Sequence, residues 1–115
     1  MTQSLAILNN PALANLEGLD NLREVGGGIT IQANGSLRDL SGLESLASVH
    51  FNFLISDNPA LTSLRALVKL KSCYGLYVLN NASLPTCEAE ALRGKLDSLL
   101  YFSIRDNDDL EVCAP

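Results

Sequence analysis

Hydrophobic and polar positions recur along the chain in a unit of about 24 residues. Each unit holds an apolar pair two residues apart, two further residues, an asparagine, two more residues and a leucine. The asparagines are Asn10, Asn34, Asn58, Asn81 and Asn107. The apolar pairs are Leu5/Ile7, Ile29/Ile31, Phe53/Ile55, Leu76/Val78 and Phe102/Ile104. A fixed period of about 20–50 residues is the signature of a repeat architecture.

The apolar pairs predict short strands, because side chains alternate between the two faces of a strand. In the first three units, further leucines follow at three-residue steps, which fit neither a long strand nor a 3.6-residue helical period. They are Leu16, Leu19, Leu22, Leu40, Leu43, Leu46, Leu64, Leu67 and Leu70. Such a coil buries its inner row only by stacking on its neighbours. The pattern predicts an α/β, leucine-rich-repeat-like fold, a right-handed parallel β-solenoid of about five repeats.

The chain reads as one domain over residues 1–115, with repeats near 5–26, 27–50, 51–74, 75–100 and 101–115. The fourth unit departs from the frame, since Leu92, Leu96 and Leu99 have helical spacing. Thr86 suits an N-cap, and Glu88 lies where a helix dipole favours negative charge. We expect a capping helix over about 87–99 and a final strand over 102–105.

The asparagine column and the glycines predict how the coils turn. A short amide side chain can bond the backbone of its own coil and of the next where the chain turns inward. Gly18, Gly42 and the run Gly26–Gly28 fit tight corners. Ala66 replaces the corresponding glycine in the third unit, so we expect that this corner does not demand a positive φ.

Charge and hydropathy exclude two classes of partner. The formal net charge is -5, and the eight Lys and Arg residues are scattered, so we expect no nucleic-acid binding. No run approaches the roughly 20 apolar residues of a membrane span. Leu5 and Ile7 already follow the repeat, and no secretory leader is visible. We therefore expect Met1 to begin a fragment, so that the missing leader does not decide the compartment.

The sequence offers little support for catalysis. We expect that the protein is not an enzyme and holds no cofactor or metal. His50 is the single histidine and falls after Val49, where an exposed loop or a packing role is the default. An acidic turn could bind calcium or pair carboxylates for glycoside hydrolysis, but its spacing fits no EF-hand loop and nothing opposite suggests a cleft. Its members are Asp106, Asp108, Asp109 and Glu111.

The outward strand positions predict a contact surface instead. Leu54, Tyr77 and Leu79 should lie side by side on the exposed sheet, and a neighbouring turn column adds further rings. These are His50, Phe51, Tyr74 and Tyr101. A protein or glycan ligand would suit this face, unless a flanking segment covers it. The alternative function is a structural or self-associating module, such as a homodimer or an appendage component, joined through the N-terminal coil or the apolar face.

The motifs Asn-Pro-x-Leu and Leu-x-Gly-Leu-x-x-Leu-x-x-Val resemble the receptor L domain, a leucine-rich-repeat relative of growth-factor receptor ectodomains. They are also similar to repeat regions of bacterial exported surface proteins, in which 84–92 and 107–115 resemble a recurring C-terminal cap. The resemblance covers essentially the whole chain. It implies a parallel solenoid, an extracellular or cell-surface setting and a binding role without catalytic residues. The chain departs from the family in lacking an N-terminal cap and in losing one residue near Gly75.

Three cysteines leave one without an intramolecular partner. The resemblance to the cap implies a disulfide between Cys87 and Cys113, which would be stabilising by roughly 3 kcal/mol on chain-entropy grounds. In a reducing compartment the two would instead stay thiols. Cys73 takes the place of Val25 and Val49 in the earlier units, so we expect a small buried hydrophobic residue.

Overall fold

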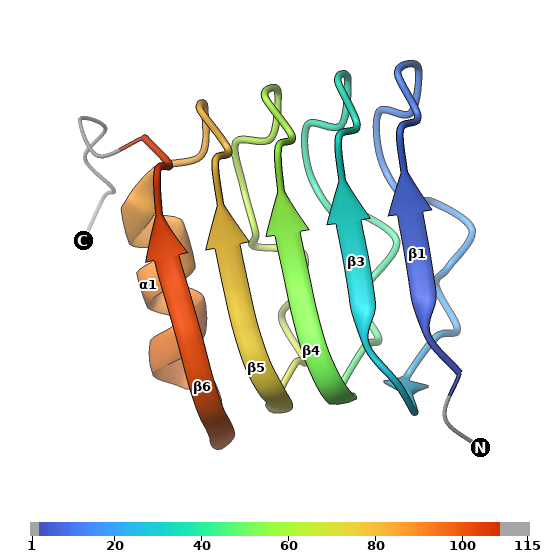
Figure 1. The fold of residues 1–115 in the computed structure, drawn as a ribbon. Coiled ribbons are helices and arrows are strands. Elements are labelled where there is room, and N and C mark those ends of the chain that lie inside the picture. Colours follow the sequence, from blue (N-terminus) through green and yellow to red (C-terminus); the bar gives the residue numbers. More distant parts are fainter. Residues whose placement is uncertain (1–2, 109–115) are drawn as a thin grey trace.

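Five parallel strands stand side by side and form the front of a solenoid of about four turns (Figure 1). The structure is a computed structural model and describes residues 3–108. The strands are β1 (Leu5–Leu8), β3 (Ile29–Gln32), β4 (Ser48–Ser56), β5 (Ser72–Leu79) and β6 (Ser98–Arg105), in that order across the sheet. The short strand β2 (Glu24–Val25) pairs with β4 off this path. The predicted parallel solenoid is therefore confirmed.

Register places equivalent positions of successive units next to one another. Leu5 pairs with Ile29, Ile29 with Phe53, Phe53 with Leu76, and Leu76 with Phe102. The inward side chains stack into one aliphatic core, which the leucines of the loops behind the sheet complete. Each fully buried Leu or Ile contributes about 1.5–3 kcal/mol, so the stack supplies most of the stability of the fold.

The helix α1 (Thr86–Lys95) packs behind the sheet near β6, but it is shorter than the sequence predicts. Leu96 already has an extended backbone, and Leu99 belongs to β6, where it pairs with Cys73. Pairing with the long strand β5 starts at Ser98 and outweighs the helical spacing of the leucines. The N-cap is Pro85, and Thr86 is the first helical residue rather than the cap.

The strands β4 and β5 also begin earlier than predicted. The expected turn column of His50, Phe51 and Tyr74 lies within these strands, because Ser48 and Val49 pair with both neighbours. A register shift between Val49 and Asn52 marks a bulge in this part of the sheet. The rings therefore stand on the sheet itself and not on the turns beside it.

Glycine is required for two reasons: at some positions the backbone has a positive φ, and at another a Cβ would collide with the next strand. Gly18 and Gly42 have φ angles of 109° and 116°, so this corner adopts a positive φ where glycine is present. Ala66 is not among the positive-φ residues, so the corner does not demand a positive φ, in agreement with the prediction. Gly28 has no positive φ but comes close to the next strand, where a Cβ would lie 2.7 Å from the carbonyl oxygen of Asn52.

A column of left-handed residues precedes the asparagines at every turn. The φ angles in this column lie between 56° and 60°. The residues are Asn9, Ala33, Asp57, Asn80 and Asp106. Asn and Asp tolerate this conformation, whereas alanine is strained there. Each turn therefore has the same backbone shape, which keeps the coils in register.

Candidate interaction surface

The five asparagines form a hydrogen-bonded ladder along the turns, which we call the asparagine ladder. The backbone N–H and the Nδ2 of Asn34 both donate to Oδ1 of Asn58 at 3.1 Å, and Nδ2 also donates to the Ile7 carbonyl oxygen at 3.1 Å. The same bonds recur between the other members of the ladder. Asn34, Asn58 and Asn81 are fully buried. The ladder is therefore structural and not a ligand site.

Three exposed aromatic rings cross the outer face of the sheet, and we call them the aromatic row. The Phe51 and Tyr74 rings stack with centroids 5.6 Å apart, and the Tyr74 and Tyr101 rings meet edge to face at 5.4 Å. The rings come from the adjacent strands β4, β5 and β6. Electrostatic repulsion from Tyr101 raises the pKa of Tyr74, so its hydroxyl stays neutral at physiological pH. The row is an uncharged, apolar ridge.

Beside this ridge the outer face is hollowed into a depression of about 390 Å³, the outer depression. Leu54 and Tyr77 are register partners and line it, as does Leu79 two residues further along β5. Thr30 and Phe51 also contribute to its wall. The structure thus brings together Leu54, Tyr77 and Leu79, which are half-buried rather than fully exposed.

The depression lies beside an outward row of the sheet in which two positions, Gly28 and Gly75, lack side chains. Asn52 pairs with Gly75, and the Asn52 backbone also lies against Gly28. A Cβ on Gly75 would lie 2.5 Å from Asn52 Oδ1 and 2.8 Å from Cε2 of Tyr77. The Asn52 amide and the Tyr77 ring therefore both lie over Gly75. Sequence reasoning missed Asn52, although it could be found by reading the position just before each apolar pair.

Asn52 Oδ1 is the one buried side-chain polar atom without a hydrogen-bond partner within residues 3–108. An unpaired buried acceptor costs about 1–3 kcal/mol, so such groups in native proteins call for an explanation. Asn52 contributes to the wall of the outer depression, and its Oδ1 lies over Gly75 beside the Tyr77 ring.

His50 lies apart from the outer depression. Its Nε2 bonds a carboxylate oxygen of Glu24, and both side chains are largely exposed. A second hollow of about 370 Å³ includes His50, Tyr74 and Leu100. His50 therefore borders the aromatic row, where it is an exposed polar side chain and not a packed core residue.

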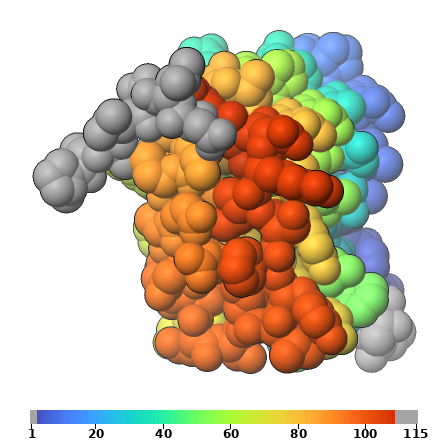
Figure 2. Space-filling view, turned by 60° about the vertical axis from the view of Figure 1, so that its left-hand side comes forward, coloured from blue at the N-terminus to red at the C-terminus, as the bar shows by residue number. Residues whose placement is uncertain are grey.

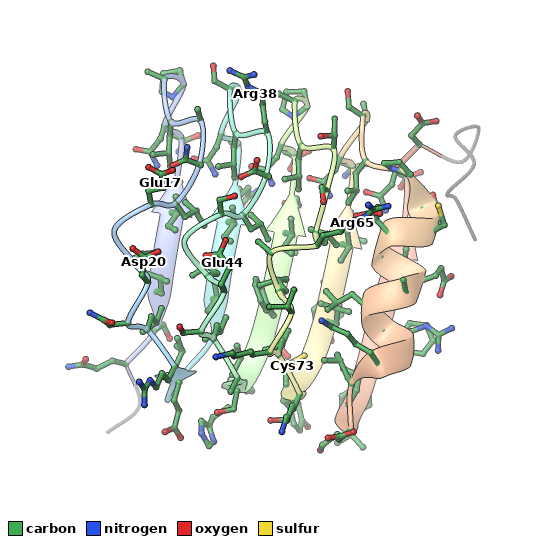
Figure 3. All side chains as sticks on the ribbon, turned by 180° about the vertical axis from the view of Figure 1, so that it is seen from behind. Glu17, Asp20, Arg38, Glu44, Arg65 and Cys73 are labelled. Atoms are coloured by element: carbon green, nitrogen blue, oxygen red, sulfur yellow. The ribbon has the colours of Figure 1, made fainter. Side chains whose placement is uncertain are left out.

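Many charged side chains lie on the loops behind the sheet, which form a different kind of surface. Figure 3 shows Glu17, Asp20, Arg38, Glu44 and Arg65 on these loops. The outer depression, in contrast, has no charged residue in its wall among residues 3–108. The two sides of the solenoid thus offer different chemistry.

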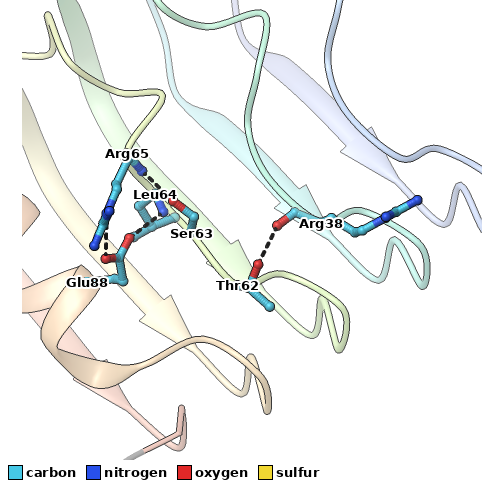
Figure 4. A network of polar contacts seen from close by, with 6 residues as sticks. All are labelled: Arg38, Thr62, Ser63, Leu64, Arg65 and Glu88. Atoms are coloured by element: carbon cyan, nitrogen blue, oxygen red, sulfur yellow. Dashed lines mark hydrogen bonds and ion pairs between the residues drawn. The ribbon is translucent and has the colours of Figure 1, made fainter. Parts of the chain in front are cut away.

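Glu88 of α1 joins the cap to the preceding coil (Figure 4). Its carboxylate accepts hydrogen bonds at 3.1 Å from the backbone N–H of Leu64 and from Nε of Arg65. In the same network, the Thr62 hydroxyl donates to the Arg38 carbonyl oxygen at 3.3 Å. Glu88 was predicted only to favour the first turn of the helix through the helix dipole. Its main role is to accept a hydrogen bond from the backbone N–H of Leu64 in the coil beside it.

The cysteines and the acidic turn offer no metal site among the residues that the structure describes. Cys73 is a free thiol in the core, and burial raises its pKa to about 11. Cys87 lies in α1, whereas Cys113 lies outside the described residues, as do Asp109 and Glu111. Over residues 3–108, no helix is long and apolar enough to cross a membrane.

The C-terminal end of the sheet differs from its middle, as Figure 2 shows from the side of β6 and α1. Phe102 was predicted to face the core, and its register partner Leu76 is fully buried. Phe102 itself is 53% exposed, because β6 is the last strand of the sheet. The guanidinium of Arg93 lies 4.6 Å from the centre of the Phe102 ring and covers part of it. This cation–π contact shields the edge.

The chain matches no known protein-family model, and neither a curated protein nor a solved structure is significantly similar to it.

Proposed function

We propose that the protein is a non-enzymatic interaction module that binds a partner through the outer face of its sheet. The aromatic row is the observation that supports this proposal. Three neighbouring rings stay exposed beside an outward row that includes Leu54, Tyr77 and Leu79, although burying the rings would be favourable. Exposed aromatic clusters of this kind are enriched in binding interfaces, where tyrosine often contributes most of the energy.

The experiment compares the outer face with the back of the solenoid. Immobilised protein is screened against a glycan array and a displayed library of folded domains and peptides. Every ligand is then titrated against Tyr74→Ala and Phe51→Ala. Val68→Ala is the matched control, because Val68 is 61% exposed, much like Phe51 at 54%, but lines the hollow behind the sheet next to α1.

We expect Tyr74→Ala to weaken binding roughly 30-fold, as for the loss of an anchor worth about 2 kcal/mol, with Val68→Ala unchanged. Ligands that bind all three variants equally well would contradict a role for the outer face. Circular dichroism spectra of the variants confirm that each is folded.

The proposal extends to the setting of the protein. We propose that it belongs with the receptor-L-like, leucine-rich-repeat proteins of the cell surface or the extracellular space, and that Cys87 and Cys113 form a disulfide there. The repeat frame supports the first part, and the position of Cys87 at the start of the cap supports the second. Mass spectrometry of the unreduced protein after proteolysis should find the two peptides joined. Their recovery as separate alkylated peptides would remove this part of the proposal.

A second candidate, self-association through the N-terminal coil, has an observation of its own. Leu5, Ile7 and Leu19 are only partly buried, whereas their equivalents in the next coil are fully buried, namely Ile29, Ile31 and Leu43. β1 also lies at an edge of the sheet. Light scattering over a concentration series tests this candidate. A dimer that Ile7→Lys dissociates would support it, and a monomer at every concentration would argue against it.

A further inference from the structure

We propose that the outer depression is a binding site for a neutral saccharide, with Asn52 as its hydrogen-bonding group and Tyr77 as its movable wall. This inference rests on the proposed function and names the class of ligand that the outer face takes. Three observations carry it: the uncharged lining, the pairing of an apolar wall with hydroxyl and amide groups, and the unpartnered oxygen of Asn52.

The lining selects against charged ligands. In the part of the chain that the structure describes, the depression of about 390 Å³ has no Lys, Arg, His, Asp or Glu in its wall, although charged residues are present on the back of the same coils. A charged ligand placed here would lose its hydration without gaining a partner of opposite charge. The volume is in the range of sites for small ligands, about 300–1,000 Å³. The ligand is therefore small and neutral.

The distribution of polar groups favours a ligand that has one apolar face and a rim of hydrogen-bonding groups. Leu54, Leu79 and the Tyr77 ring supply apolar surface, and Ser4, Thr30 and Asn52 supply hydroxyl and amide groups beside it. A pyranose ring has this character, because one face of the ring presents C–H groups and its rim presents hydroxyls. An extended peptide would gain its main affinity from backbone bonds, which a sheet offers at its edges and not on its face.

Asn52 Oδ1 requires a donor, and a sugar hydroxyl is one. The oxygen is buried without a partner beneath the edge of the Tyr77 ring, above a glycine that leaves room for both groups. Tyr77 is half-buried and rests on Gly75 rather than in the core. Its ring can therefore lift away without opening the core, and a ligand hydroxyl can then reach the oxygen. Binding would satisfy a hydrogen bond that the free protein leaves unmade.

The test uses the whole chain labelled with 15N and a panel of neutral probes: glucose, galactose, mannose, N-acetylglucosamine and their β-linked disaccharides. We expect at least one probe to shift the Asn52 side-chain amide and the backbone amides of Thr30 and Leu54, with the amide of Val68 on the back unmoved. Asn52→Ala should weaken that binding about tenfold, which corresponds to one lost hydrogen bond.

A second variant and a stability measurement separate binding from folding. Thr30→Val removes a hydroxyl from the wall and should weaken binding several-fold, whereas Thr62→Val is the matched control on the back and should leave it unchanged. Asn52→Ala should unfold at the same temperature as the parent chain or at a higher one, because it removes an unpaired buried acceptor. Weaker binding from a protein that is no less stable would identify Asn52 as a ligand-contacting residue.

The outcomes that overturn the inference are distinct from those that overturn the proposed function. Absence of shifts in the depression with every saccharide would refute it, as would equal affinity of Asn52→Ala, which would leave the Asn52 oxygen to a bound water. A neutral capped peptide that shifts the same residues more strongly would reassign the site to peptides. If Tyr74→Ala abolishes partner binding while no saccharide binds, the interaction module stands and the saccharide site falls.

Discussion

Replacing Asn58 with alanine tests the asparagine ladder where it is most deeply buried. The substitution removes the bond from Nδ2 to the Ile31 carbonyl oxygen at 3.0 Å and the Oδ1 acceptor of two bonds from Asn34 at 3.1 Å. The Asn34 side-chain amide keeps its bond to the Ile7 carbonyl oxygen, but the Asn34 backbone N–H and the Ile31 carbonyl lose their ladder partner.

The magnitude follows from these two orphaned backbone groups. Each buried group without a partner costs about 1–3 kcal/mol, so the free energy of unfolding should fall by about 2–6 kcal/mol. This is a large share of the roughly 5–15 kcal/mol that stabilises a typical domain. Asn10→Ala is the matched control. Asn10 is exposed at the first turn, and its loss removes only the bond from Nδ2 to Asn34 at 3.1 Å, while its backbone N–H still donates there.

Urea unfolding followed by circular dichroism measures both variants. We expect Asn10→Ala to lose less than about 1 kcal/mol and Asn58→Ala several times more, with the dependence on urea concentration unchanged in both. If the two variants lose the same stability, the buried ladder does not hold the coils together as the hydrogen bonds indicate. The reasoning from orphaned backbone groups would then be wrong.

Four further substitutions probe the backbone and the core. Gly42→Ala should be severely destabilising in thermal unfolding, because its Cβ would lie 1.8 Å from the Leu16 carbonyl oxygen, whereas Gly18→Ala meets no atom within 4 Å and should cost only its backbone strain. Equal losses would refute this contrast. Ala33→Asn should raise stability by up to about 1 kcal/mol, because alanine at a φ of 60° is strained and asparagine is not; a lower melting temperature would argue against strain. Burial raises the pKa of Cys73 from 9.0 to about 11, so the thiol favours the folded state below pH 9 and this stability is lost as the pH rises toward 11. Cys73→Val should remove that part of the alkaline loss in denaturant titrations at several pH values, and an unchanged pH profile would exclude Cys73 as its source.

The fold could be predicted from the sequence because the same pattern of apolar and asparagine positions recurs in each unit. The apolar pairs give the strands, and the asparagine spacing gives the register, since equivalent residues of stacked coils become neighbours. Whether a segment forms a helix or a strand was harder to predict where both were possible. Leu96 and Leu99 have helical spacing, but the edge of β5 offers backbone partners from Ser98 onward, and spacing alone does not weigh one against the other.

The surface was predicted less completely for a related reason. Tyr77 and Leu79 follow from the strict alternation of a strand, but the bulge between Val49 and Asn52 breaks that alternation. For this reason the sequence pattern predicted that the rings of the aromatic row lie on turns and not on the strands. The outer depression lies beside two positions without side chains, Gly28 and Gly75, and the effect of a missing side chain appears only when the neighbouring strands are in place.

Stacking divides the positions of each coil into inward and outward ones. The inward residues are constrained by the repeat, whereas the outward residues are free to differ from coil to coil. Inward leucines and the asparagine ladder must fit the coil before and the coil after, so their chemistry is fixed by the repeat. Outward positions meet only their register neighbours, so a residue such as Asn52 can stand among small neighbours without disturbing the stack. An unpaired buried oxygen at an inward position would weaken two interfaces between coils. In the wall of the outer depression it costs the fold one hydrogen bond, which a ligand can restore.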